Sequence, residues 1–290
     1  MPTDAALPAN APAPTRPTGR EVIYRHSLIV RITHWVNVIV ISLLLMSGAQ
    51  IFNAHPRLYW GAAGADADTP WLEMAALNPD SEKPKGVLHL GRHRFTTTGV
   101  LGISKAADGT WAEVGFPRWA TLPGVRDLAT GRRWHFFLAW LFVVNGLIYL
   151  AAGALNGHFR RDLAPTSEQL RPRNILADIV DHILLKHPVG EAAKRYSLLQ
   201  KLAYLIVVFI LLPLMVLTGL TMSPGVDAAI PWLLDLLGGR QSARSIHFIT
   251  ANLIVLFVIV HLVEVFIAGV FNEIGSMITG RYAVAPEKRS

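Results

Sequence analysis

Cysteine is absent from all 290 residues of this chain. Without thiols the chain cannot form disulfides, hold an iron–sulfur cluster through thiolates or attach a haem through thioether bonds. Charge is also scarce, because only 16% of the residues are charged whereas 52% are hydrophobic. This balance excludes most water-soluble proteins and is typical of an integral membrane protein.

Acidic residues are fewer than basic ones, 20 against 27, and the formal net charge is +7. No nucleic-acid-binding motif or basic stripe accompanies this excess, so nucleic acid is not expected as a partner. The amino-terminal residues are mainly Ala, Pro, Thr and Asn, and they lack the basic start and apolar run of a signal peptide. We expect no cleavage there, and residues 1–22 are predicted to form a disordered tail.

The apolar residues are concentrated in four windows that are long enough to cross a bilayer. These windows cover approximately residues 33–52, 134–155, 198–222 and 245–271. The predicted fold is an all-α integral membrane protein, a four-helix bundle over residues 23–275, followed by a carboxy-terminal tail at 276–290. The loop at 53–133 is expected to lack regular structure, and a loop of that length is usually functional.

The positions of the cations predict the orientation, since short cytoplasmic loops are rich in Lys and Arg. The loop between the third and fourth windows has only Arg240 and Arg244. The cations before the first window and between the second and third are more numerous: Arg16, Arg20, Arg25, Arg31, Arg160, Arg161, Arg171, Arg173, Lys186, Lys194 and Arg195. Both termini should therefore be cytoplasmic in a bacterial inner membrane, and the long first loop should be external.

Two histidines of the last window, His247 and His261, stand 14 residues apart. On an α-helix this offset is about 3.9 turns and about 21 Å, so both rings leave the same face, one near each membrane surface. Imidazoles within lipid are costly and usually mark a site.

Two further histidines, His34 and His135, open the first and second windows. With the amino terminus inside, His34 lies at the depth of His261, and His135 lies at the depth of His247. Each pair would fill both axial positions of a haem iron, which suits electron transfer rather than oxygen binding. We therefore predict two non-covalent b haems, although each histidine alone could be an interfacial or helix-capping group.

Small and basic residues near these histidines are candidate haem surroundings. Gly48 follows His34 by 14 residues, at the depth of the outer pair, where it would let a flat macrocycle approach or simply let helices pack. Arg31 near the inner pair, and Arg132, Arg133 and Arg244 near the outer pair, could meet haem propionates or reach the membrane interface.

Several segments together resemble the bacterial cytochrome b561 and nickel-hydrogenase/formate-dehydrogenase cytochrome b family. They are His34-Trp35-Val36-Asn37, Ser47-Gly48, His135, Tyr196-Ser197-Leu198-Leu199-Gln200-Lys201 and the His247/His261 pair. The resemblance covers residues 24–275 and implies a di-haem subunit that passes electrons between a membrane quinone and an external partner enzyme.

The resemblance also implies that ubiquinone or menaquinone binds near the inner haem, with Ser197, Gln200 and Lys201 as candidate contacts beside His261 and Asn37. Glu264, one turn beyond His261, could pass protons or form an ordinary ion pair.

The long loop carries a narrower resemblance. Its segments His89-Leu90-Gly91-Arg92-His93 and Pro117-Arg118-Trp119-Ala120-Thr121-Leu122-Pro123-Gly124 resemble the thiosulfate-reductase-type membrane anchors, which implies a molybdopterin-containing partner. Its four tryptophans, Trp60, Trp71, Trp111 and Trp119, favour a partner surface, or they fold the loop onto the membrane. His89 and His93 could hold a metal through their spacing, but no third ligand is evident.

Two other functions stay open from the residues alone. One is a self-contained quinone-linked oxidoreductase, such as a superoxide oxidase or a transmembrane ferric reductase. The other is a haem-free anchor or transporter. The sequence does not predict the direction of electron flow.

Overall fold

The computed structural model describes residues 21–64, 68–186 and 190–284. Residues 1–20 of the predicted amino-terminal tail and residues 285–290 of the predicted carboxy-terminal tail lie outside this part of the chain. Residues 276–279, also assigned to the carboxy-terminal tail, belong to the last helix, and Val22 and Arg281 lie in strands. Regular structure therefore extends into both predicted tails, further than the hydropathy pattern indicates.

Within these described residues, four helical stretches are long and apolar enough to cross a membrane, which confirms the predicted fold class. They are α1 (Leu28–Phe52), α2 (Leu128–Leu155), a third span at Leu198–Thr221 and α8 (Arg240–Thr279). The first two begin before their apolar windows because a cap fixes the start of each helix. The Ser27 hydroxyl accepts the N–H of Val30, and the Asp127 carboxylate accepts the N–H of Thr130.

The third and fourth spans are irregular. The third consists of α4 (Leu198–Ile206), a π-helical turn η4 (Val207–Leu211) and α5 (Leu212–Thr221). Pro213, which has no N–H and crowds the preceding turn, accounts for the change of hydrogen bonding there. In α8, Gly269 adopts φ 112° and ψ 85°, a conformation open to glycine, and it kinks the helix.

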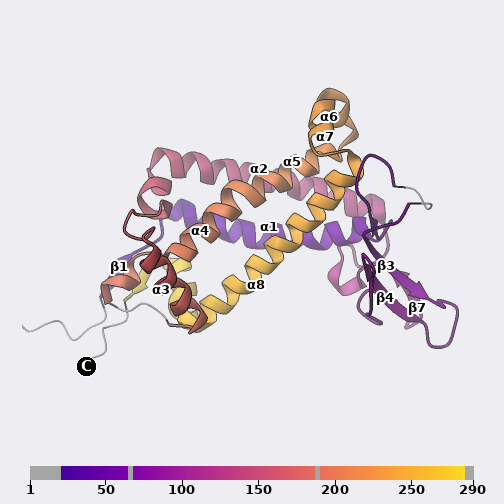
Figure 1. The fold of residues 1–290 in the computed structure, drawn as a ribbon, viewed down its shortest axis with the longest axis horizontal. Coiled ribbons are helices and arrows are strands. Elements are labelled where there is room, and N and C mark those ends of the chain that lie inside the picture. The colour runs from indigo at the N-terminus through magenta and orange to yellow at the C-terminus, as the bar shows by residue number, and fades with distance from the viewer. Residues whose placement is uncertain (1–20, 65–67, 187–189, 285–290) are drawn as a thin grey trace, which may run out of the picture.

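The described part of the chain begins and finishes on the same side of the bundle (Figure 1). There β1 (Val22–Tyr24) pairs antiparallel with β8 (Arg281–Ala283), near α3 (Pro172–Ile183). We call this side the terminal end; it also holds η2 (Phe159–Leu163) and η3 (Gly190–Lys194). The opposite side, the loop end, holds the first loop together with η1 (Arg118–Ala120), α6 (Pro224–Ala229) and α7 (Pro231–Leu236).

The first loop folds into strands, so the expectation of an irregular loop was wrong. A four-stranded antiparallel sheet contains β2 (Arg57–Leu58), β3 (Leu72–Leu77), β4 (Lys85–Leu90) and β5 (His93–Thr96) in that order. A separate hairpin contains β6 (Gly102–Lys105) and β7 (Trp111–Val114). The two residues between β4 and β5 are Gly91-Arg92, and Gly91 has the positive φ of 57° that such a tight hairpin turn requires.

The loop end is attached firmly to the bundle. Phe52 at the end of α1 and Phe248 on α8 pack with the apolar residues of β3. The Trp71 indole donates to the Ser245 hydroxyl at 2.9 Å, and the Asn53 side chain bonds both backbone groups of Phe116. The strands therefore pack against the last turn of α1 and the first turns of α8, close to the histidines predicted for the outer pair.

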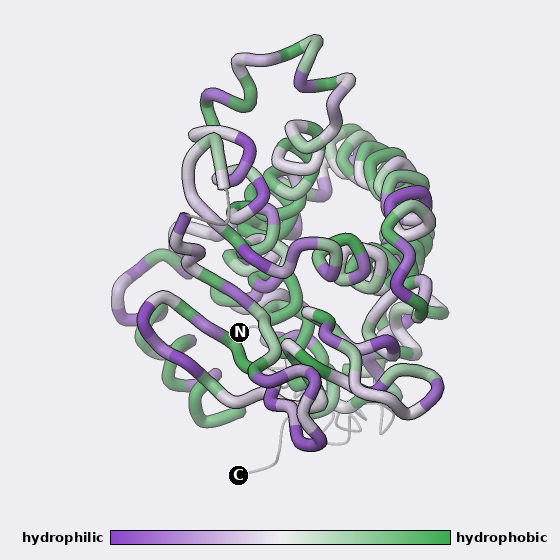
Figure 2. Tube along the Cα trace, turned by 90° about the vertical axis from the view of Figure 1, so that its right-hand side faces the viewer, coloured by the Kyte–Doolittle hydropathy of each residue, from purple (hydrophilic) through white to green (hydrophobic). Residues whose placement is uncertain are grey.

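The outer surface of the spans is strongly apolar. Leu155 is 87% exposed and Phe271 is 92% exposed, whereas Val40, Leu138 and Phe142 form a buried cluster between the helices. Figure 2, which looks at the loop end, shows hydrophobic residues concentrated in the helices and hydrophilic residues frequent in the loop in front of them. Exposed side chains of this kind are stable in lipid, so the distribution agrees with a membrane bundle.

Candidate functional site

The inner histidine pair joins α1 to α8. The rings of His34 and His261 lie with their centroids 6.4 Å apart and their planes at 66°. Phe257, one turn before His261, stacks on its ring with centroids 5.9 Å apart. The Nδ1 atom of His34 is buried and has no hydrogen-bond partner among the residues that the structure describes.

The outer histidine pair joins α2 to α8 in nearly the same geometry. The rings of His135 and His247 have centroids 6.3 Å apart, again with an interplanar angle of 66°. The structure thus brings together the four predicted histidines in the predicted pairs, and α8 contributes one imidazole to each.

The separation within each pair fits two imidazoles that bind one metal from opposite sides. An imidazole nitrogen lies about 2 Å from a bound transition metal and about 1 Å from its own ring centre, so opposed rings have centres about 6 Å apart. The observed distances of 6.4 and 6.3 Å match this value. Both pairs therefore have the spacing that a bis-histidine haem site would need.

Hydroxyl groups fix the tautomers of the outer pair. The Ser47 Oγ lies 3.0 Å from His135 Nδ1, and the Thr218 Oγ1 lies 2.9 Å from His247 Nδ1. Each hydroxyl donates its own proton to a backbone carbonyl, that of Leu44 for Ser47 at 3.1 Å and that of Leu214 for Thr218 at 2.7 Å. The hydroxyl oxygens are therefore left to accept Nδ1–H, so Nε2 of each ring keeps the free lone pair that a metal needs.

Two glycines stand against the same rings. A Cβ added at Gly48 would lie 3.4 Å from His135 Cε1, and one added at Gly219 would lie 3.5 Å from His247 Cε1. Gly48 thus lies at the depth expected for it, and Gly219 is a second glycine in the equivalent position. Three further residues at this site, Ser47, Thr218 and Gly219, were not predicted as parts of it. Their signal was the repeat of a hydroxyl residue followed by glycine, Ser47-Gly48 and Thr218-Gly219, late in the first and third spans.

The arginines proposed to surround the haems are placed differently from one another. Arg31 donates to the carbonyl of Ile278 at 2.5 Å, and its Nε is buried without a hydrogen-bond partner among the described residues. Arg244 donates to the carbonyl of His55 and lies over the Phe52 ring at 5.6 Å. Arg132 lies 5.8 Å from the Phe136 ring, and Arg133 is exposed. Arg31 and Arg244 are therefore held close to the histidine pairs by the protein itself.

A cavity of about 940 Å³ opens at the terminal end, one to two turns from His34. Its walls come from the chain before and within the first turn of α1, the end of α2, η2 and the start of α4. The cations on its walls outnumber the acids: they are Arg25, Arg161, Lys194, Arg195 and Lys201, against Asp162. Burial, followed by the positive charge of Arg25, lowers the pKa of His26 on the same wall to about 4. His26 is therefore a neutral imidazole at ordinary pH.

An aspartate–histidine pair lies on the cavity wall. His158 Nδ1 is 2.7 Å from an oxygen of Asp162, whose carboxylate also accepts two hydrogen bonds from Arg161. Burial alone would raise the pKa of Asp162, but the hydrogen bonds from Arg161 and His158 outweigh it and leave the pKa below its usual range. The ionised carboxylate accepts the Nδ1–H of His158 and orients the ring, which leaves Nε2 as the ring nitrogen available for proton exchange.

The three predicted quinone contacts take different positions. Lys201 lines the cavity and donates to the Ala164 carbonyl and to Gln169 Oε1, both at 3.1 Å. Ser197 and Gln200 do not line it; each bonds the other's backbone N–H and so caps the start of α4. Asn37, also predicted nearby, accepts a hydrogen bond at 2.8 Å from the Asn145 amide.

The possible metal pair in the loop is not formed. His93 on β5 is paired with Leu90, the neighbour of His89 on β4, so the two imidazoles leave opposite faces of the sheet. His89 instead lies 3.1 Å from Glu73. No group of three or more His, Cys, Asp or Glu side chains that could hold a metal occurs in the described part of the chain.

A four-helix membrane bundle whose interior presents opposed histidine pairs, without cysteine, defines a membrane cytochrome b, a class that carries electrons. The comparison with protein families agrees, because residues 25–280 match the prokaryotic cytochrome b561 family model. The chain belongs to the prokaryotic cytochrome b561 family. Membership implies haem b and confirms the resemblance drawn from the sequence.

A curated relative adds a similarity of comparable extent. The chain is 29% identical over 247 residues to a putative protein-methionine-sulfoxide reductase subunit, YedZ1, of Azospira oryzae. The similarity covers 85% of this chain and 92% of the relative. No solved structure matches the chain.

Proposed function

We propose that this protein is a di-haem cytochrome b that carries electrons between a quinone and a redox enzyme docked at its loop end. The observation that carries the proposal is the equal spacing of two opposed histidine pairs, at 6.4 and 6.3 Å, on a single helix. His34 and His261 would hold the inner haem, and His135 and His247 the outer one. Each haem, when bound, would supply a one-electron iron couple between two imidazoles.

The cavity at the terminal end is the proposed site for the quinone headgroup, ubiquinone or menaquinone. Support comes from its volume of about 940 Å³, its position before His34 and the amine of Lys201 on its wall. Ser197 and Gln200 would act indirectly, by holding the helix that carries Lys201.

Protons would leave the quinol through the aspartate–histidine pair. Oxidation of one quinol releases two electrons and two protons, and the electrons leave singly through the histidine sites. His158 Nε2, left free by the bond of Nδ1 to Asp162, would accept a proton and release it to water at the terminal end. Asp162 would stay ionised and hold the ring in that tautomer.

The partner would be a redox enzyme at the loop end, because the sheet there is attached to α8 just before His247. Trp60 and Trp119 on this side are 54% and 72% exposed, and exposed tryptophans favour a protein contact. The name of the Azospira relative favours electron flow from quinol to a reductase that acts on oxidised methionine. A molybdopterin cofactor in that partner follows from the resemblance of the loop alone.

The orientation we propose puts the protein in a bacterial inner membrane with both termini cytoplasmic and the loop end outside. The cation-rich segments at the terminal end support it. The partner would then be periplasmic, and quinol would release its protons on the cytoplasmic side.

Haem stoichiometry tests the central claim. We expect two extractable b haems per purified chain, one after His247→Ala and one after His261→Ala, each variant losing a different spectral component. His93→Ala, which removes an exposed imidazole on β5 away from both pairs, is the matched control and should keep both haems. A single haem in the unaltered protein, or two low-spin haems in either histidine variant, would contradict the scheme.

A further inference from the structure

The helix α3, which lies in the chain between the second and third spans, carries a stripe of exposed apolar side chains. Its outward side chains include Leu176, Val180 and Ile183, which are 64%, 48% and 73% exposed. They follow one another at intervals of four and three residues and so form one stripe along the helix. Leu184, directly after the helix, is 56% exposed and continues the stripe.

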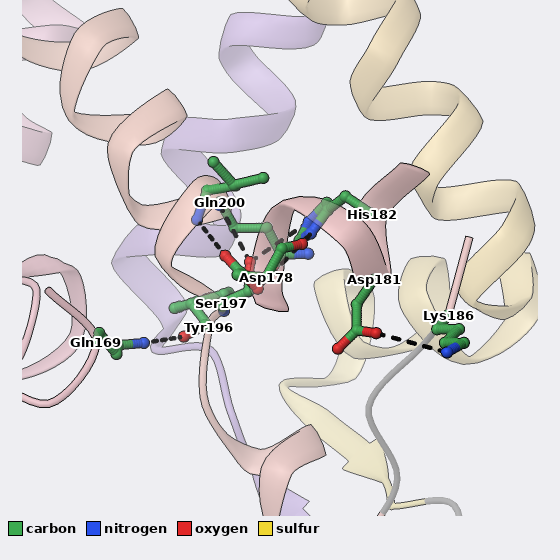
Figure 3. A network of polar contacts seen from close by, with 9 residues as sticks. Gln169, Asp178, Asp181, His182, Lys186, Tyr196, Ser197 and Gln200 are labelled. Carbon is green, nitrogen blue, oxygen red and sulfur yellow. Dashed lines mark hydrogen bonds and ion pairs between the residues drawn. The ribbon is translucent and has the colours of Figure 1, made fainter. Parts of the chain in front are cut away.

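Two polar side chains of α3, Asp178 and His182, turn toward the start of α4 (Figure 3). Asp178 accepts the backbone N–H of Leu199 at 2.8 Å, at the first turn of α4. His182, one turn later, lies 3.5 Å from the Ser197 hydroxyl that caps the same helix. Because these two polar side chains face inward and the aliphatic stripe faces outward, the medium on the outer side of α3 is expected to be apolar.

Charged residues stand at both ends of the stripe. Arg171 and Arg173 precede and begin α3, and Lys186 follows its last residue; all three are exposed. Cations at a helix amino terminus are unfavourable for the helix itself, because the backbone dipole is positive there. Their long side chains can instead reach phosphate groups while the helix lies flat against acyl chains.

We propose that α3 is an interfacial helix, embedded in the leaflet at the terminal end, with its Leu176–Ile183 stripe in the acyl region and its basic ends on anionic lipid headgroups. The chain connectivity favours lipid over a protein as the occupant, because α3 joins two membrane spans at one membrane surface. Through Asp178 this helix would also hold the start of α4, which carries Lys201 into the cavity.

The absence of native cysteine allows a site-specific test. Single cysteines at Leu176 and Ile183 on the stripe, and at Asp181 on the other side as the control, are labelled with bimane in the full-length protein. The protein is placed in vesicles of phosphatidylcholine and phosphatidylglycerol. We expect brominated lipid to quench the labels at Leu176→Cys and Ile183→Cys several-fold more than aqueous iodide does, and the reverse at Asp181→Cys. Unchanged haem content shows that each variant is folded.

Two outcomes would overturn the proposal. Iodide quenching of the Ile183→Cys label as strong as that at Asp181→Cys would put the stripe in water. Resistance of the stripe labels to both quenchers would put a protein surface there. Binding to anionic headgroups is tested by omitting phosphatidylglycerol from the vesicles. This omission should weaken lipid quenching of the stripe labels in the otherwise native protein, but not in the same protein with Arg171→Gln and Arg173→Gln. Equal quenching with and without phosphatidylglycerol in the otherwise native protein would contradict binding to anionic lipid.

Discussion

At the outer pair, two hydroxyl groups decide which nitrogen of each imidazole carries its proton. Ser47 and Thr218 come from the first and third spans, whereas the rings that they contact come from the second and fourth. The outer pair is therefore completed by two helices that supply neither of its rings. Hydroxyl residues followed by glycine are common in packed membrane helices, so the sequence alone could not assign them this role.

Removing one hydroxyl should weaken the outer haem site. Ser47→Ala takes away the group that orients His135, and loss of such a partner typically lowers metal affinity about 10-fold or more. We expect faster loss of the outer haem to apomyoglobin, with the inner haem unchanged. The control is Ser42→Ala, whose hydroxyl bonds only the Val38 carbonyl of the same helix at 2.7 Å. Equal haem loss from both variants would mean that Ser47 acts only in packing.

The His158–Asp162 pair should be visible in the rate of quinol oxidation. His158 Nε2 would accept a proton from the quinol, and His158→Gln removes this acceptor. We expect haem reduction by quinol to slow about 10²-fold or more, the usual contribution of a general base. The control His93→Gln, on exposed β5, should keep the native rate. A native rate in His158→Gln, with both haems present, would place proton release elsewhere.

Among the elements, α8 has the most demanding geometry, because it carries one histidine of each pair and is then kinked at Gly269. After the kink at Gly269 its last turns lie against the start of α1. The carbonyl of Met277 accepts the Trp35 indole N–H at 3.0 Å, and that of Ile278 accepts Arg31. The kink thus fixes the two residues that flank the His34 region.

The kink predicts a contrast between two glycines of α8. An added Cβ at either Gly269 or Gly275 would meet nothing within 4 Å, so only the backbone conformation separates them. Gly269→Ala forces a side chain into a positive φ and should cost about 1–2 kcal/mol, which lowers the melting temperature. Gly275→Ala should be neutral or stabilising by up to about 1 kcal/mol, since alanine favours an ordinary helix. Equal melting temperatures in detergent would mean that the kink is relaxed in solution.

The elements that the sequence predicted are those fixed by one strong pattern. Long apolar runs predicted the four spans, and the depth of the four histidines predicted their pairing. The sheet at the loop end was missed because its short strands each bury only part of a face, although Gly91-Arg92 carries a hairpin signal. The helix α3 was missed because its stripe of apolar residues is too short for a membrane span, and the bends at Gly269 and η4 depend on tertiary packing.

For the whole molecule, the two ends differ enough to allow a direct test of orientation. Ala107 lies exposed in the β6–β7 turn at the loop end, and Glu191 in η3 is an exposed side chain at the terminal end. In intact spheroplasts, Ala107→Cys should react with a membrane-impermeant maleimide, whereas Glu191→Cys should react only after lysis. The opposite result would reverse the orientation and move the partner to the cytoplasm.

The spacing of His247 and His261 along α8 also ties the protein to the membrane potential. An electron passing between the two pairs would cross about 21 Å of an apolar layer about 30 Å thick. A full crossing is worth about 2.3 kcal/mol for each 100 mV, so this transfer would sense about seven-tenths of that, or about 1.6 kcal/mol. With the terminal end in the negative cytoplasm, voltage would draw electrons toward the loop end. An energised cell would thus keep the external enzyme reduced, and every electron exported would discharge part of the gradient that drew it.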